Sequence, residues 1–159
     1  LDNAKEKYLN NKNIKFEEIK SSKDISFNSK ELFDLFICME TLEHIPPADV
    51  CNYLEKISKF CSGYLLFTVP NEKGIFFLLK RIIKLNSDNY QYNLKEIINI
   101  TLGRTNSVKR FQHKGFDYEN IIYDINKFFR IIKVEGSPLG RFFPKFLCFN
   151  ICIIAKVNE

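Results

Sequence analysis

The sequence predicts an α/β fold with a mostly parallel sheet and an antiparallel hairpin at its C-terminal end. Two short apolar runs, residues 32–38 and 64–69, are typical of buried parallel strands whose two faces are both covered by helices. Apolar residues at helical spacing over residues 50–60 predict the helix that connects them. The last two predicted strands, residues 130–134 and 146–155, have no helix between them, so we expect an antiparallel pair at one sheet edge.

The chain before the first apolar run predicts three further segments. Residues 1–9 have the spacing of a helix, and the two asparagines that follow end it. Residues 14–19 alternate between apolar and polar side chains, as a strand does, and a polar loop follows at residues 20–30.

Helices are also predicted in the second half of the chain. Residues 75–85 and 92–102 both have helical spacing, and we expect residues 75–117 to form a lid over the substrate. Asp117 is the predicted N-cap of a helix that runs to residue 129. The first of these helices has apolar and basic sides, so it either packs on the sheet edge or makes a peripheral contact with a membrane.

Length and composition indicate one globular domain. The 159 residues are 45% hydrophobic and 27% charged, which suits a folded chain of that size. The net charge is +5, but the basic residues are scattered among acids, and we therefore expect no nucleic-acid partner. Five cysteines without paired spacing predict a protein of the reducing cytoplasm.

Polar side chains follow the first apolar run at once. Glu40, Glu43 and His44 come directly after it, where open α/β sheets bind their ligands. A histidine at the mouth of a cleft can act as a general base, so Glu43 and His44 are the candidate catalytic pair. The alternative is that both side chains only brace the first turn of the helix that follows.

Three segments of the chain resemble class I S-adenosylmethionine-dependent methyltransferases. Residues 33–45, FDLFICMETLEHI, are similar to the fourth-strand signature of that family, in which an aspartate opens the strand and Glu-His-Ile closes it. Residues 64–71, YLLFTVPN, resemble its fifth strand, and residues 113–120, HKGFDYEN, resemble the segment before its sixth strand. The resemblance implies a Rossmann-like sheet with the strand order 3-2-1-4-5-7-6.

The same resemblance implies a cofactor and the residues that hold it. The backbone of Cys38, Met39 and Glu40 should face the methionine part of S-adenosylmethionine, and the loop with Ser21 and Ser22 should pass its adenine. The methyl acceptor would be a small molecule, a lipid-linked precursor or a saccharide.

The resemblance also implies substrate-side residues. His113 matches the histidine that contacts substrate in the family, and its alternative role is a hydrogen bond within its loop. Asn71 ends the fifth-strand segment, where it either orients a substrate or caps the turn.

If this resemblance holds, the chain starts inside the helix after the family's second strand. The first two strands and the glycine-rich turn are then missing, because no two of the six glycines form a Gly-x-Gly pair. We therefore expect a truncated methyltransferase domain that binds little or no cofactor by itself. The competing interpretation is a non-catalytic remnant that binds a partner.

A second alternative concerns a metal ion, although the principal interpretation assigns no metal ligand. On a helical turn Glu40, Glu43 and His44 share one face, and with His113 they are similar to the metal-binding set of small-RNA 2′-O-methyltransferases. The lack of a basic groove disfavours an RNA acceptor.

Overall fold

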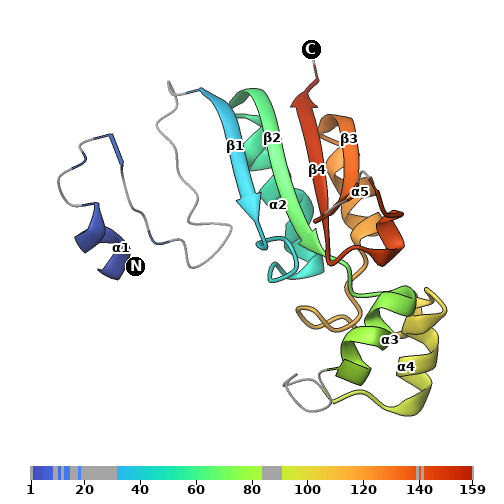
Figure 1. Cartoon of the computed structure of the whole chain (residues 1–159). Coiled ribbons are helices and arrows are strands. Elements are labelled where there is room, and N and C mark those ends of the chain that lie inside the picture. The colour runs from blue at the N-terminus through green and yellow to red at the C-terminus, as the bar shows by residue number, and fades with distance from the viewer. Residues whose placement is uncertain are drawn as a thin grey trace.

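Four strands form a single mixed sheet in the computed structural model (Figure 1). They are β1 (Phe33–Met39), β2 (Cys61–Pro70), β3 (Phe129–Ser137) and β4 (Asn150–Val157), in the spatial order β1-β2-β4-β3. β1 and β2 are parallel, and β4 is antiparallel to both of its neighbours. The predicted fold class is therefore confirmed, including the antiparallel C-terminal pair. The structure describes residues 2–8, 11, 13, 14, 18, 32–83, 91–138, 140 and 142–158.

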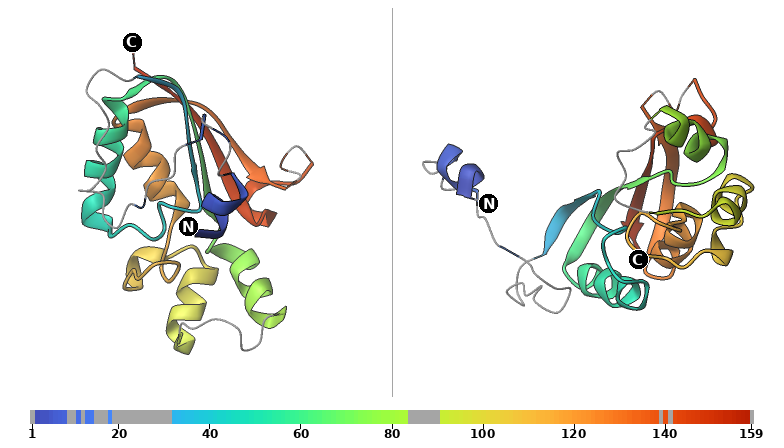
Figure 2. Two further views of the ribbon diagram at one scale, coloured as in Figure 1. Left: turned by 90° about the vertical axis from the view of Figure 1, so that its left-hand side faces the viewer. Right: turned by 90° about the horizontal axis from the view of Figure 1, so that it is seen from below.

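Two helices cover one face of the sheet, as Figure 2 shows. They are α2 (Pro47–Ser58) and α5 (Tyr118–Asn126). α2 begins at a proline, whose fixed φ suits the first helical position. Asp117 precedes α5, and its side chain accepts a hydrogen bond from the Glu119 backbone amide, so the predicted N-cap is confirmed. The core between helices and sheet is fully buried and includes Leu54, Leu65, Phe67, Ile121, Phe129 and Ile153.

The prediction that helices cover both faces of the first strand is wrong for the residues that the structure describes. Four apolar side chains on the other face of β1 and β2 are more than half exposed: Leu35, Ile37, Met39 and Tyr64. Within the described part of the chain, β1 has β2 as its one strand neighbour and lies at a sheet edge. Burial of β1 is therefore confined to its helix-facing side, which the apolar run alone could not reveal.

The N-terminal predictions are only partly described. α1 (Asp2–Lys7) lies within the helix predicted at residues 1–9. Most of the strand predicted at residues 14–19 falls outside the described residues, as does the loop at residues 20–30.

Two helices pack together beyond the carboxyl ends of the parallel strands (Figure 1). They are α3 (Gly74–Ile83) and α4 (Leu94–Thr101), where two of the predicted helices were expected. Phe77, Ile100 and Val108 form a small core of their own between these helices and the segment that follows. Among the described residues, no helix has the length and hydrophobicity needed to cross a membrane.

The β3–β4 connection differs from its prediction. The last strand begins at Asn150 rather than residue 146, because Pro144 and the short 3-10 helix η3 (Lys145–Leu147) turn the chain first. Cys148 consequently lies buried in the connection, while Cys152 lies half-buried within β4. All five cysteines are free thiols.

Candidate functional site

The candidate site lies at the end of the sheet where the carboxyl ends of β1, β2 and β3 come together. β1 and β2 are parallel, and β3 runs in the same direction because it is antiparallel to β4, as β2 is. The turn at residues 40–46 follows β1 and leads into α2, while residues 71–73 follow β2 and lead into α3. The polar residues after both strands therefore meet at one edge, as the sequence predicts.

Glu40 is held in an unusual backbone conformation at the start of the turn. Its φ of 48° lies in the left-handed region, which residues other than glycine seldom adopt. The Glu40 amide donates to the Thr68 carbonyl at 3.0 Å, and the Thr41 hydroxyl donates to the Met39 carbonyl at 3.0 Å. Strained backbone of this kind concentrates at ligand sites, where neighbouring bonds hold it in place.

Glu43 is a buried carboxyl group without a hydrogen-bond partner. The residue is 1% exposed, and neither carboxylate oxygen has a partner among the described residues. The pKa of Glu43 is raised to about 7, chiefly by burial; its own backbone amide and Arg110 act to lower it, and the nearby carboxylates of Glu40 and Glu72 add to the rise. At neutral pH this side chain can therefore exchange a proton or accept a cation.

Two imidazoles lie beside this carboxyl group. His44 Nε2 is 3.5 Å from Glu43 Oε1, and the rings of His44 and His113 meet edge to face with centroids 4.9 Å apart. His113 Nδ1 is also 3.7 Å from Glu72 Oε1, which Lys80 contacts at 3.3 Å. The structure thus brings the predicted catalytic pair and the predicted substrate-side histidine into one cluster.

That cluster has the donor set of a metal site. Glu43, His44 and His113 each offer one ligand atom, and these three atoms lie within 4.8 Å of one another. One carboxylate oxygen with two imidazole nitrogens suits Zn²⁺ and similar divalent ions. The unpartnered oxygens of Glu43 are consistent with a cation, since a buried carboxylate otherwise stays protonated.

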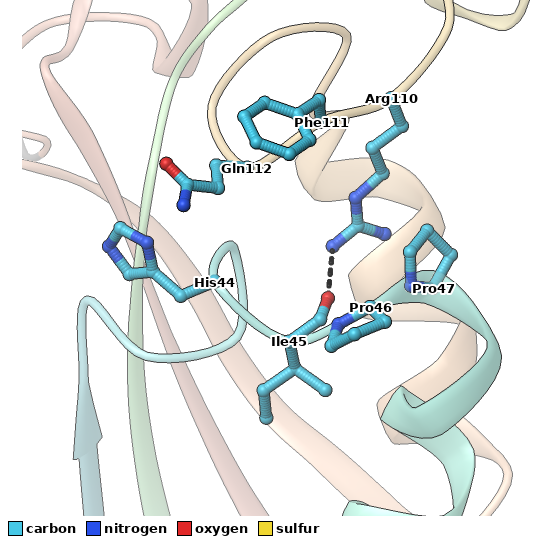
Figure 3. A pocket seen from close by; sticks show the side chains of 7 residues that line it. All are labelled: His44, Ile45, Pro46, Pro47, Arg110, Phe111 and Gln112. Carbon is cyan, nitrogen blue, oxygen red and sulfur yellow. Dashed lines mark hydrogen bonds between the residues drawn. The ribbon is translucent and has the colours of Figure 1, made fainter. Parts of the chain in front are cut away.

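A cavity of about 250 Å³ opens beside the cluster (Figure 3). His44 lies at one side of it and Arg110 at the other, with Phe111 and Gln112 above. Arg110 Nη2 donates to the carbonyls of Leu42 at 3.2 Å and Ile45 at 3.5 Å, so it fastens the turn after β1 to the loop before α5. The cavity is also lined by Ile45, Pro46 and Pro47.

The five predicted cofactor residues do not share one environment in the structure. The Cys38 side chain points into the core, where its Sγ lies 3.5 Å from the Tyr53 hydroxyl, so only its backbone is left to face a ligand. Met39 and Glu40 are exposed at the end of β1, which fits a cofactor that approaches the strand end. Ser21 and Ser22 lie outside the described residues.

The Asn71 side chain makes hydrogen bonds within the protein. It is fully buried, and its side-chain amide donates to the carbonyls of Cys148 at 3.0 Å and Lys145 at 3.3 Å. These bonds tie the end of β2 to the β3–β4 connection. Its Oδ1 has no partner among the described residues, so the substrate role is left as a prediction.

Sequence reasoning missed several contributors to this edge of the sheet. Glu72 and Arg110 both act on the pKa of Glu43, yet neither lies in the motif after β1. Lys73 and Thr105 bind the Asp117 carboxylate at 2.6 and 2.7 Å, a cluster for which only the N-cap was foreseen. The position of Glu72 directly after a buried strand was the one available signal.

Solved structures with the same fold were found by structural comparison. No protein-family model matches the sequence, and no curated protein sequence does so. An S-adenosylmethionine-dependent methyltransferase from Clostridium acetobutylicum aligns with 99% of this chain and 71% of its own, at TM-score 0.63 and 14% identity. The PH0226 protein from Pyrococcus horikoshii aligns with 99% of this chain and 65% of its own, at TM-score 0.63 and 11% identity.

The chain has a class I methyltransferase fold. Its strands β1, β2, β4 and β3 take the places of the fourth, fifth, seventh and sixth strands in the implied order. The small RNA methyltransferase HEN1 shares this methyltransferase fold over 84% of the present chain and 15% of its own, at TM-score 0.52 and 17% identity. At such identities the likeness concerns the fold, and the present chain spans only about two-thirds of the first two structures.

Proposed function

We propose that this chain is part of an S-adenosylmethionine-dependent methyltransferase that acts on a small-molecule, lipid-linked or saccharide acceptor. The observation that carries the proposal is the cluster of Glu43, His44 and His113 at the carboxyl end of β1 in a methyltransferase-like sheet. Ligands of open α/β sheets bind at this edge. The strained backbone at Glu40 marks the same place.

The chain's own residues would divide the work between binding and proton transfer. Met39 and Glu40 would hold the amino acid part of the cofactor, which supplies the methyl group when it is bound. Alignment of acceptor and methyl group is the main requirement of such a displacement. For a hydroxyl or amine acceptor, His44 would take the proton on Nδ1, and Glu43, close to its Nε2, would stabilise the resulting imidazolium.

Calorimetry with S-adenosylmethionine tests this function. We expect little or no heat from the 159-residue chain, and binding once the chain is expressed with the sequence encoded upstream of it. Conversion of His44 to alanine in that longer protein should lower the methylation rate about 100-fold or more, while cofactor binding is kept. An absence of heat from the longer protein would instead favour a non-catalytic remnant.

A second candidate function adds a metal ion to the same site. It is favoured by the three ligand atoms within 4.8 Å and by the buried Glu43 carboxylate that lacks a partner. A divalent ion there would act as a Lewis acid toward the acceptor oxygen. An RNA acceptor is disfavoured, because the basic residues are scattered along the sequence rather than gathered as a groove requires.

Zinc binding by the purified chain separates the two candidates. A metal site predicts saturable Zn²⁺ binding in calorimetry that is lost in Glu43→Gln and in His113→Asn. The matched control is Glu55→Gln on the exposed side of α2, which pairs only with Lys59 in the described structure and should bind as the parent does. Equal binding by all variants would exclude the metal site.

A further inference from the structure

One side of α3 is apolar and exposed. Its exposed members follow the spacing of a single helix face and are Ile75, Leu79, Ile82 and Ile83. The opposite side buries Phe77 against Ile100 and Val108, while Phe76 is buried at the border of the exposed side. A surface helix normally places polar residues on its outer side, so an apolar outer side indicates that something covers it.

The connection before β4 extends this apolar surface. Its exposed aromatic residues are Phe142, Phe143, Phe146 and Phe149. The Phe149 ring meets the Phe76 ring of α3 with centroids 4.7 Å apart, and Ile75 and Phe146 line one cavity. In Figure 1 this connection, which contains η3, lies beside α3 at the lower end of β4. We refer to the exposed apolar residues of α3 and of residues 142–149 as the α3–η3 surface.

The two segments that form the α3–η3 surface carry basic residues and no acid. Residues 74–83 and 142–149 contain two lysines and one arginine. The nearest acids lie beside these segments: Glu72 pairs with Lys80, and Glu119 lines the cavity that Ile75 and Phe146 share. Lys145 is exposed between Phe143 and Phe146. The strands of the sheet differ, because β1 carries the exposed Asp34 and β3 carries Glu135, which is half-buried and pairs with Lys133.

We propose that the α3–η3 surface docks on an anionic membrane, with its aromatic residues at the boundary between headgroups and acyl chains. The exposed phenylalanine and isoleucine side chains lie on segments whose own charges are all basic, and Lys145 is exposed among the aromatic residues. This combination matches a membrane, which has an apolar interior and negatively charged headgroups. The inference is independent of the methyltransferase proposal, although it would bring the carboxyl edge of the sheet close to a lipid-linked acceptor.

Vesicle flotation of the 159-residue chain tests the docking. Vesicles that contain phosphatidylglycerol should carry the chain upward, whereas vesicles of phosphatidylcholine alone should bind it far more weakly, and added salt should weaken the anionic binding. The double variant Phe142→Ser/Phe143→Ser should lower the affinity at least about tenfold, because both side chains are exposed and available for burial in lipid. Lys145→Gln should lower it about fivefold.

The matched control is Leu35→Ser/Ile37→Ser, which removes two apolar residues, each more than half exposed, from the bare sheet face. Retained vesicle binding in this control, with loss in the phenylalanine variant, supports the docking. Equal loss in both variants, or equal binding to neutral and anionic vesicles, overturns it. The docking is also overturned if the parent chain does not bind vesicles and forms a dimer that the phenylalanine variant dissociates. The α3–η3 surface would then join two copies of the chain.

Discussion

Two carboxyl groups are buried at the same edge of the sheet in opposite surroundings. Asp117 is held by the Lys73 ammonium at 2.6 Å, the Thr105 hydroxyl at 2.7 Å and the Glu119 amide at 2.9 Å. Glu43 has no hydrogen bond to either oxygen within the described chain. Both side chains are under one-tenth exposed.

The difference separates a structural acid from one that is available to a ligand. Asp117 caps α5 and joins it to the segments after β2 and α4, so its charge is fully used within the protein. Hydrogen bonds to Asp117 and Glu119 raise the pKa of Lys73, outweighing burial, which is the largest single influence and acts to lower it. Glu43 has none of this support, and that is why we assign it to the site.

Asp117→Ala should have the largest effect on stability. It removes the α5 cap and leaves the largely buried Lys73 ammonium with the exposed Glu119 as its one carboxylate partner among the described residues. The free energy of unfolding, measured by urea denaturation, should fall by about 3–5 kcal/mol. Glu119→Gln is the control and should cost less than about 1 kcal/mol, because that side chain is largely in solvent. Similar losses in both variants would contradict the structural role of Asp117.

Glu43→Gln should instead stabilise the protein at pH 8. The folded pKa of about 7 lies above the unfolded value, so the parent loses stability as pH rises from about 4.5 to 7 and stays at the lower level above that. The variant lacks this ionisation and should be more stable than the parent at pH 8, by up to about 3 kcal/mol. The two proteins should be similar near pH 4. A variant that is less stable at pH 8 would show that the carboxylate has a partner.

Arg110→Met should weaken the turn that contains Glu43 and raise the pKa of its carboxyl group. The turn loses the donor to the Leu42 and Ile45 carbonyls, and unfolding should become easier by about 2 kcal/mol. The pKa of Glu43 should also rise, because Arg110 is the nearby cation that lowers it. A nuclear magnetic resonance titration of the Glu43 carboxyl in parent and variant measures this change; an unchanged midpoint would rule out the coupling.

Thr105→Val should give the smallest effect of the series. It removes one donor to Asp117 and keeps the shape of the side chain, so denaturation should report a loss of about 1 kcal/mol. Thr41→Val is the comparison near Glu43: the Thr41 hydroxyl donates to the Met39 backbone carbonyl at an exposed position, so its loss should change the free energy of unfolding less. An effect at Thr105 no larger than at Thr41 would weaken the contrast between the two carboxyl groups.

The sequence predicted those parts of the fold that local patterns determine. Apolar runs located β1 and β2, and Asp117 before an amphipathic segment located the start of α5, because strand burial and helix capping depend on near neighbours in the chain. The bare face of β1 was mispredicted, since an apolar run does not show how many layers cover it.

The candidate site could be predicted only in part, because some of its residues come together through contacts between distant parts of the chain. The motif after β1 gave Glu43 and His44, but the approach of His113 from a distant part of the chain came from the resemblance alone. Glu43's lack of a hydrogen bond and the contacts of Lys73 with Asp117 depend on tertiary packing, which no spacing in the sequence encodes.

The central claim is that the sheet edge after β1 holds a buried carboxyl group that the protein leaves for a ligand. The most direct measurement is a pH titration of the Glu43 side-chain carboxyl by nuclear magnetic resonance in the folded, ligand-free chain. We predict a midpoint of about 7, because burial without a partner favours the protonated form. A midpoint near the ordinary glutamate value of about 4.3 would mean that Glu43 is solvated or paired, and would contradict the account.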